Sequence, residues 1–297
     1  MRTCHMRPQN IIKLARFTRK FSRYDNPFAY RLMRKLLKKV YPIQPQYSSL
    51  RTVIEYDQGF INVDTSSLME YNILFYGHCE PVITCLIKSI VKPGDLCLDI
   101  GANIGAITLV MSFAAGHNGK VVAVEPHPRM VERLKANVDL NRLDNVSIIP
   151  AALSDTAGRA VLYTAEEDYY HQGRSSLNRS QGINKEITVE TITGKMLQNE
   201  FGNQVCKFIK IDVEGHDFIV LKELSNIIAK HRPHLIFEYS RDRWREHDCD
   251  IMQALEFISG YDYTIYFVKH DVIFPFEKVV PDSCDIFCSS KINRSSL

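Results

Sequence analysis

The amino-acid sequence predicts an α/β fold: a doubly wound, mostly parallel sheet with an antiparallel C-terminal strand, preceded by basic helices. Short apolar runs alternate with helical patterns between residues 96 and 259, as strands joined by crossover helices do. The last two apolar runs, 264–268 and 285–289, follow without a helix between them and are typical of an antiparallel hairpin.

The composition fits one globular domain with an N-terminal appendage, because the 297 residues are 45% hydrophobic and 24% charged. No apolar run approaches the roughly 18 residues of a membrane span, so we do not expect an integral membrane protein. The eight cysteines are scattered, several of them inside strand-like runs. This distribution predicts reduced thiols in a reducing compartment, and therefore a cytoplasmic location. Cys284 and Cys288 predict a strand with two core cysteines rather than half of a metal site, so we expect no metal.

The chain is predicted to divide into a basic helical extension, residues 1–45, and a larger domain, residues 46–297. Residues 1–40 carry twelve Lys and Arg against a single acid, a net charge of +11. The whole chain carries +3, so the remainder carries −8. Apolar residues over 11–17 predict one amphipathic helix, and Asn26–Pro27 can start a second.

These basic helices have three interpretations. They are suited to lie on an anionic membrane, which would make the protein membrane-peripheral, or to bind a polyanion. An Arg-rich, acid-poor start also resembles an organelle transit peptide, if the source is eukaryotic. The third interpretation is a helical flap that packs on the domain and whose charges are solvated. Nucleic-acid binding is disfavoured, because no aromatic platform or known motif accompanies the charge.

The elements of the larger domain are predicted from its turn residues and from the spacing of its apolar residues. A small hairpin, 52–56 with 60–63, precedes a helix over 79–91. An inserted hairpin, 158–164 with 186–191, encloses the polar loop 165–184. The other expected strands are 96–100, 120–125, 146–150, 206–212 and 234–238, and the expected helices are 106–115, 129–141, 196–201, 217–230 and 251–259.

The turn after the first buried strand is the centre of this pattern. Gly101 and Gly105 bracket it, and a nearly all-apolar helix follows. A strand, a glycine-bearing turn and a helix N-terminus form a site for a nucleoside ligand, because small residues let the ligand lie against bare backbone.

The polar residues around this turn narrow the choice of nucleoside. The spacing of Gly101 and Gly105 is not the Gly-x-Gly-x-x-Gly fingerprint of dinucleotide binding. Asn103 lies between the glycines, and Asp99 precedes them, where a carboxylate would repel a pyrophosphate but suits an ammonium or sulfonium group. Glu125 ends the next strand, where a carboxylate can accept both ribose hydroxyls. Together these residues favour S-adenosylmethionine over NAD.

Four motifs can be compared with a known family: Gly94–Gly105, Val124–Pro126, Ala151–Asp155 and Ile209–Gly215. Together they resemble the FkbM family of S-adenosylmethionine-dependent methyltransferases, over roughly residues 50–290. The resemblance implies a Rossmann-like methyltransferase fold with a C-terminal antiparallel strand. It also implies, most often, O-methylation of a sugar, polyketide-type or related hydroxyl, and it says nothing about the basic helices.

Residue roles at the cofactor follow from this resemblance and from the turn. Asp99 and Gly101 would face the methionine part, and Glu125 would bind the ribose. Ala152 and Asp155 follow the third strand, where the adenine ring usually lies in such folds, although Asp155 can instead cap the next turn. The complete expected set is Asp99, Gly101, Asn103, Gly105, Glu125, Ala152 and Asp155.

Asp212 and Glu214 are the candidate catalytic carboxylates, because they follow a buried strand at the ligand-binding edge of an open sheet. Residues two apart in a strand point to the same side, so the two would share a cavity. Close carboxylates raise one pKa, which suits a general base that takes a hydroxyl proton. His216 is the alternative base. The structural alternative is that Asp212 caps the helix that begins near His216.

Two further residues are noted near this edge. Glu238 ends the fifth strand and is a pocket candidate, and Trp244 lies in a charged loop that either touches substrate or packs between domains.

The sequence therefore predicts an S-adenosylmethionine-dependent methyltransferase that O-methylates a hydroxyl of a sugar, glycan or secondary-metabolite acceptor. A competing hypothesis is a peripheral membrane or polyanion-binding protein with a vestigial cofactor pocket. An NAD-dependent dehydrogenase is disfavoured, because its glycine fingerprint is missing. The sequence does not identify the acceptor.

Overall fold

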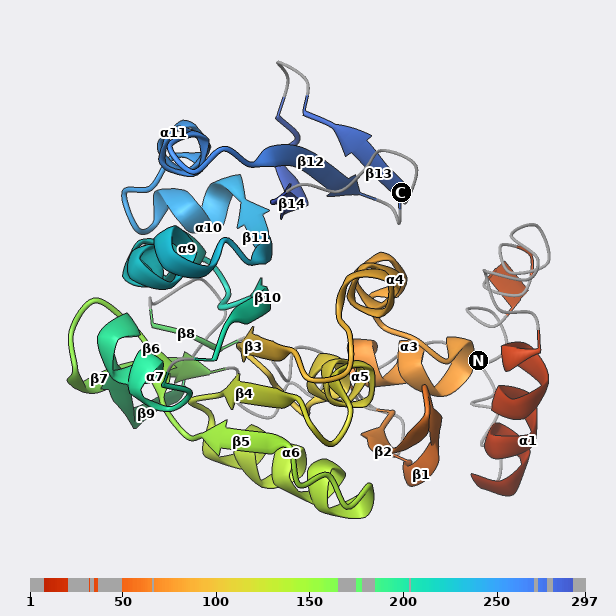
Figure 1. Cartoon of the computed structure of the whole chain (residues 1–297). Helices are drawn as coiled ribbons and strands as arrows, with labels where there is room; N and C mark the ends of the chain where they lie inside the picture. Colours follow the sequence, from red (N-terminus) through yellow and green to blue (C-terminus); the bar gives the residue numbers. More distant parts are fainter. Residues whose placement is uncertain are drawn as a thin grey trace. The chain divides into compact units, whose positions relative to one another are not determined.

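The computed structural model describes residues 8–20, 32, 35–36, 50–65, 67–164, 175–177, 185–202, 204–269, 272–276 and 280–290 (Figure 1). Contacts divide the chain into two compact units, residues 1–79 with 167–172 and residues 80–166 with 173–297. The predicted boundary between residues 45 and 46 lies outside the described residues, as does most of the predicted second basic helix. Both stay predictions.

The first unit contains two helices and one hairpin. Its elements are α1 (Pro8–Arg19), β1 (Arg51–Tyr56), β2 (Gly59–Asp64) and α3 (Leu68–Tyr76). β1 and β2 pair antiparallel, so the predicted hairpin and the predicted first helix are confirmed.

The C-terminal end of α1 is joined to the end of α3 by side-chain donors. Thr18 Oγ1 donates to the carbonyl oxygen of Phe75 at 2.6 Å. The guanidinium of Arg19 donates to the carbonyl oxygens of Leu74 and Ile73 at 2.8 and 3.0 Å. The last carbonyls of a helix lack intrahelical donors, so these contacts satisfy the end of α3 and fix α1 on it.

The second unit is built around a large sheet, whose described strands follow the order β13-β12-β14-β11-β10-β3-β4-β5. Parallel ladders join β5, β4, β3, β10 and β11, whereas β14 lies antiparallel between β11 and β12. This arrangement confirms the predicted fold class. The strands are β3 (Leu96–Ile100), β4 (Lys120–Val124), β5 (Val146–Ile149), β10 (Cys206–Ile211), β11 (His234–Ser240), β12 (Thr264–Lys269), β13 (Val272–Pro275) and β14 (Ser283–Ser289).

Helices cover both faces of this sheet (Figure 1). α4 packs on α5, and α6 packs on β4 and β5 on the same side. Residues of α7 to α11 share one hydrophobic cluster with alternate strand residues on the opposite side. The helices are α4 (Pro81–Ile90), α5 (Ala106–Ala115), α6 (Pro128–Leu140), α7 (Gly194–Asn199), α8 (Asp217–Glu223), α9 (Ser225–His231), α10 (Arg241–Arg245) and α11 (Ile251–Ser259).

The alternation of side chains along β3 and β10 decides which residues reach the functional edge. Leu98, Ile100 and Ile209 belong to the cluster beneath α8 and α9. Asp99 and Lys210 alternate with these apolar residues, so they point to the opposite face, where α4 and α5 lie.

The structure differs from the predicted elements in two helices. The predicted helix 217–230 is two helices, because Leu224 ends α8 and begins α9. The predicted charged loop around Trp244 is the short helix α10. Trp244 is only 1% exposed and packs against the rings of Phe218, Phe237 and Tyr239. Trp244 is therefore a core residue of this unit, which contradicts the alternative that it touches substrate.

A smaller sheet holds the inserted hairpin in the order β6-β9-β7-β8. β7 and β9 pair antiparallel, as predicted. The short strand β8 lies within the predicted loop 165–184, most of which is outside the described residues. The strands are β6 (Ala152–Leu153), β7 (Gly158–Thr164), β8 (Ser175–Ser176) and β9 (Lys185–Ile192).

The described cysteines inside strands are core residues, whereas Cys79 and Cys249 are half-buried and Cys85 is exposed. Cys284 and Cys288 are buried in β14, and the cysteines in the described part of the chain are free thiols. The described residues contain no group of three or more His, Cys, Asp or Glu side chains that could hold a metal ion. Among them, no single helix is long and apolar enough to cross a membrane. Only α3 and α4 taken together have the length and composition of a membrane span.

Candidate nucleoside and methyl-transfer site

The site begins where β3 and β10 end side by side. The amide of Asp212 donates to the carbonyl oxygen of Ile100 at 2.9 Å, which continues the ladder past the end of β10. Gly101 has a φ of +83°, and a Cβ at this position would lie 1.9 Å from the Asp212 carbonyl oxygen. Glycine is therefore required at 101 by the packing of two strand ends as well as by the turn. This close approach brings the turn 101–105 next to the loop 212–217.

Glu125 holds the turn in place. Its Oε2 accepts from the amide of Asn103 at 2.8 Å, and its Oε1 accepts from the amide of His127 at 2.9 Å. Asn103 has a φ of +53°, a left-handed conformation that Asn tolerates better than most residues. Asn103 thus contributes its backbone shape and its amide to the site. Burial raises the pKa of Glu125 to about 7, although the two amide donors oppose the rise.

Gly105 ends the turn and precedes α5. Its φ is +90°, and a Cβ there would lie 2.5 Å from Leu134 Cδ1 on α6. Gly105 therefore lets α6 pack closely against the start of α5.

Asp99 has an oxygen that is free to bind a ligand. Its side chain is fully buried, and Oδ2 accepts from Thr108 Oγ1 of α5 at 2.6 Å. Oδ1 is buried and has no hydrogen-bond partner among the described residues. Burial raises the pKa of Asp99, and Lys210 opposes that rise. A buried, unpaired carboxylate oxygen is costly unless a donor reaches it, so this atom suits the ammonium group of a bound ligand.

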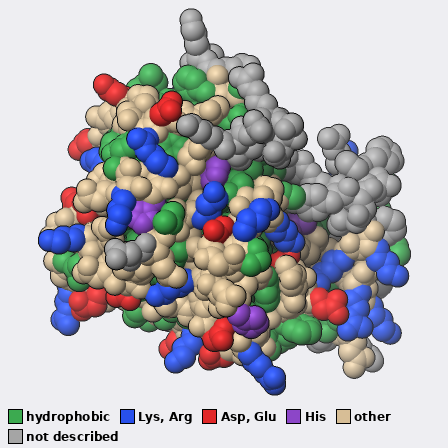
Figure 2. All heavy atoms as spheres, viewed as in Figure 1, with side chains coloured by type: hydrophobic (Ala, Val, Ile, Leu, Met, Phe, Trp, Pro, Cys, Tyr) green, Lys and Arg blue, Asp and Glu red, His purple; other side chains and the backbone are tan. Residues whose placement is uncertain are grey.

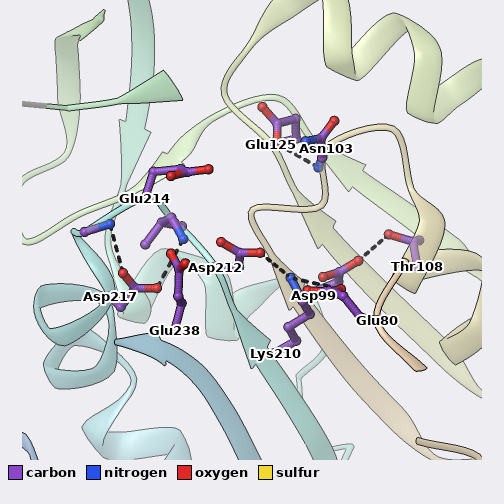
Figure 3. A network of polar contacts seen from close by, with 12 residues as sticks. Glu80, Asp99, Asn103, Thr108, Glu125, Lys210, Asp212, Glu214, Asp217 and Glu238 are labelled. Carbon is purple, nitrogen blue, oxygen red and sulfur yellow. Dashed lines mark hydrogen bonds and ion pairs between the residues drawn. The ribbon is translucent and has the colours of Figure 1, made fainter. Parts of the chain in front are cut away.

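Lys210 and Glu80 are site residues that the sequence analysis missed. Lys210 Nζ lies 2.9 Å from Asp212 Oδ2 and 4.0 Å from Glu80 Oε2 (Figure 3). Glu80 is the residue that precedes α4, and its burial raises its pKa to about 7. In the sequence, Lys210 itself could have indicated this part of the site, because a cation inside the apolar run of β10 needs buried partners.

The predicted common cavity for Asp212 and Glu214 rested on strand alternation, which does not apply, because β10 ends at Ile211. Asp212 pairs with Lys210, whereas Glu214, at a φ of +56°, forms an ion pair with Arg243 of α10. The Glu238 carboxylate lies 2.8 Å from the same guanidinium. The two candidate carboxylates thus contact different cations.

Asp217 shapes the loop between them. It is fully buried and accepts from the amides of Val213 and Gly215 at 3.2 and 3.0 Å. Asp217 thus closes the loop before α8. The N-cap of α8 is His216 and has no side-chain cap hydrogen bond, so the alternative in which Asp212 caps this helix is wrong, and the Asp212 side chain contacts Lys210 instead.

His216 links this loop to the segment that follows β5. It is buried at the start of α8, and its Nε2 lies 3.3 Å from Ser154 Oγ. Burial, together with the nearby His247, lowers the pKa of His216 to about 4, so its imidazole is neutral at physiological pH. Asp155 is exposed and accepts from Ser154 Oγ at 3.2 Å, and Ala152 is buried in β6. The residues predicted for the adenine side and for proton transfer therefore lie next to each other.

A nucleoside with a cationic amino-acid part fits these groups. The turn 101–105 offers bare backbone, Glu125 offers a carboxylate beside it, and Asp99 offers an unpaired buried oxygen. The geometry defines the class of the protein as a nucleoside-binding α/β protein with carboxylates at the carboxyl edge of its sheet.

Residues 99–265 match the family model described as the methyltransferase FkbM domain. The chain therefore belongs to the FkbM methyltransferase domain family, a family of S-adenosylmethionine-dependent enzymes, and the predicted family is confirmed.

Curated relatives are similar over part of their length. The hexuronic acid methyltransferase AglP of Haloferax volcanii is 27% identical over 151 residues, which is 50% of this chain and 57% of AglP. A carboxy-S-adenosyl-L-methionine synthase of Shigella boydii is 27% identical over 92 residues, 30% of this chain and 37% of that protein. The chain thus spans about half of AglP and less of the synthase.

Solved structures are similar at low identity. The FkbM methyltransferase of Methylobacillus flagellatus is 17% identical with a TM-score of 0.42, covering 74% of this chain and 53% of that one. SMU.1697c of Streptococcus mutans, a putative methyltransferase solved with S-adenosylhomocysteine (SAH), is 10% identical with a TM-score of 0.42, covering 70% of this chain and 96% of that one.

We predict that Gly101→Ala disrupts the site by a collision that Gly94→Ala avoids. Both glycines have positive φ, +83° and +96°, but nothing lies within 4 Å of a Cβ at Gly94. The unfavourable φ should cost either variant about 1–2 kcal/mol. Gly101→Ala should lose about 1–3 kcal/mol more, because its Cβ meets the Asp212 carbonyl. Urea unfolding measures both, and equal losses would show that the contact is unimportant.

Proposed function

We propose that the chain transfers the methyl group of S-adenosylmethionine to a hydroxyl group of a sugar, glycan or related acceptor. One observation carries the proposal: the turn 101–105 and the backbone of the loop that bears Asp212 are held against each other at the same edge of the sheet. A reaction between a nucleoside-borne methyl group and a hydroxyl requires this proximity.

The cofactor would be held by residues of β3, β4 and the turn between them. Glu125 would accept the ribose hydroxyls, Asp99 Oδ1 would accept the ammonium group, and Gly101 would leave room for the methionine part. S-adenosylmethionine supplies a methyl group already activated by its sulfonium. The remaining tasks of the chain are to orient the acceptor, to exclude water and to accept the hydroxyl proton.

Asp212 is the proposed proton acceptor. Its side chain is one-third exposed at the carboxyl edge, next to the turn, and its loop is fixed by the hydrogen bonds of Asp217. Glu214 lies in the same loop and would contact the acceptor, with Arg243 fixing its direction. His216 is neutral and buried beside Ser154, so it would support the adenine side rather than take the proton.

The acceptor class is supported by one relative. The similar half of AglP belongs to a protein named as a hexuronic acid methyltransferase, which makes a sugar-containing acceptor the first class to test. A methyl-transfer assay with labelled S-adenosylmethionine over fractions of a cell extract would identify the labelled product.

We predict that SAH binds more tightly as pH rises from about 6 to about 8. Over this range Glu125, whose pKa is about 7, becomes a carboxylate, which accepts the ribose hydroxyls more strongly than the neutral acid does. Calorimetry should show a rise of up to about tenfold in the wild type and a weaker, flat affinity in Glu125→Gln. An identical pH dependence in both proteins would exclude Glu125, and no binding by the wild type would exclude the cofactor.

We predict that Asp212→Asn and Glu214→Gln separate turnover from cofactor binding. Neither side chain is assigned to the cofactor, so SAH affinity should stay nearly unchanged. Turnover should fall about 10²–10⁴-fold for Asp212→Asn, which removes the proton acceptor, and less for Glu214→Gln. A parallel loss of binding and turnover would mean that the two carboxylates only support the loop.

We further infer that α1 contacts an anionic surface, either a membrane or a soluble polyanion. Lys13, Arg16 and Lys20 are exposed along α1, and Phe17 is 52% exposed among them. Figure 2 shows Lys and Arg side chains gathered over α1 at the right of the view. Cations around an exposed aromatic ring suit the boundary between headgroups and acyl chains, which favours the membrane.

Charge reversal tests this inference better than deletion, since Thr18 and Arg19 tie α1 to α3. Reversing three charges should weaken binding to phosphatidylserine vesicles by about 100-fold or more, because each contributes about 1 kcal/mol. Equal weakening by a control triple variant of the second unit, or equal binding to neutral vesicles, would contradict it. The test variant is Lys13→Glu, Arg16→Glu, Lys20→Glu, and the control is Lys135→Glu, Lys222→Glu, Lys230→Glu.

A further inference from the structure

Lys210 is a buried cation whose ammonium group contacts the candidate base directly. It is 5% exposed in the middle of the large sheet, and its Nζ lies 2.9 Å from Asp212 Oδ2. In the register of β3 and β10, Lys210 lies opposite Asp99, and its Nζ is 4.0 Å from Glu80 Oε2. Figure 3 shows these three carboxylates around one ammonium group.

The charges that face Asp212 are mostly negative. Asp99 faces it from β3, Glu80 from the start of α4 and Glu125 from the end of β4. Arg243 is a second cation near Asp212, but its Nη1 contacts Glu214 and Glu238. The charged groups that act on Asp212 from all surrounding elements are Glu80, Asp99, Glu125, Lys210, Asp217, Arg243 and Asp285.

The geometry points to Lys210 as a positioning residue for methyl transfer, whose ammonium group fixes the direction of the Asp212 carboxylate and supplies a positive charge among the surrounding carboxylates. This inference rests on the proposed function, in which Asp212 accepts the hydroxyl proton. Repulsion between neighbouring carboxylates disfavours the ionised form that a base needs. The ammonium group at 2.9 Å offsets that repulsion.

Lys210 does not serve as the base itself. Burial lowers the pKa of Lys210, but the negative charges of Asp212, Glu80 and Asp99 outweigh burial and hold its pKa above the ordinary value. The amine therefore remains an ammonium group at physiological pH and has no lone pair to accept a proton. Because Lys210 lies in strand β10, two residues before Asp212, the sheet rather than a loop holds its ammonium group in place.

The experiment compares pH–rate profiles of Lys210→Gln, Lys210→Arg and Lys207→Gln with that of the wild type. Gln keeps an N–H donor but removes the charge, Arg keeps the charge, and Lys207 lies at the other end of β10. Rates are measured with methyl-labelled S-adenosylmethionine and the glycan fraction of an extract of the source cells. Calorimetry with SAH checks each variant.

Lys210→Gln should bind SAH normally, lose turnover, and move the acid limb of its profile upward by about 1–3 pH units, because the carboxylates at this edge have lost their buried cation. Lys210→Arg should largely restore the wild-type limb, and Lys207→Gln should not move it. A uniform loss of rate in Lys210→Gln, with no displacement of the limb, would overturn the inference.

The outcomes separate this inference from the proposed function. A wild type that neither binds SAH nor transfers methyl groups contradicts both. A wild type that does both, with an unmoved limb in Lys210→Gln, contradicts only the role of Lys210. If Lys210→Gln binds no SAH, the inference is tested with Lys210→Arg instead. A displaced acid limb in the pH–rate profile of Lys210→Arg, together with normal SAH binding, would overturn the inference.

Discussion

The close approach of Gly101 to the carbonyl oxygen of Asp212 is the constraint on which the rest of the site depends. A Cβ at 101 would lie 1.9 Å from that oxygen, so the ends of β3 and β10 can meet only over a glycine. The adjoining ladder bond from the Asp212 amide to Ile100 fixes their register. Because of this contact, a turn suited to a nucleoside and a loop of carboxylates lie at the same edge of the sheet. Cofactor binding and proton transfer would therefore take place next to each other.

Charge compensation is the second requirement of this edge. The carboxylates gathered there are kept apart by two cations from different elements, Lys210 in β10 and Arg243 in α10. Each cation bridges two acids, so the removal of one cation leaves two half-buried carboxylates without that partner. The network therefore orients its acids while leaving Asp99 Oδ1 available to a ligand.

The sequence was sufficient for the fold, because buried strands and covering helices have distinct periods. It was also sufficient for the turn around Gly101 and for the strand-end position of Glu125. It was insufficient where long-range packing decides: α10 is too short for a periodic pattern, and Trp244 is buried only because Phe218 and Phe237 lie against it. The strand rule also failed for Asp212 and Glu214, since β10 ends at Ile211 and the two carboxylates contact different cations.

The measurement that tests the central claim most directly is a crystal structure of the full chain with SAH. The account predicts that the ribose hydroxyls contact the carboxylate of Glu125, that the amino group reaches Asp99 Oδ1, and that the sulfur faces Asp212. Because the turn and the carboxylate loop are already held together, little backbone movement is expected. A nucleoside bound elsewhere, or one whose ribose lies away from Glu125, would contradict the account.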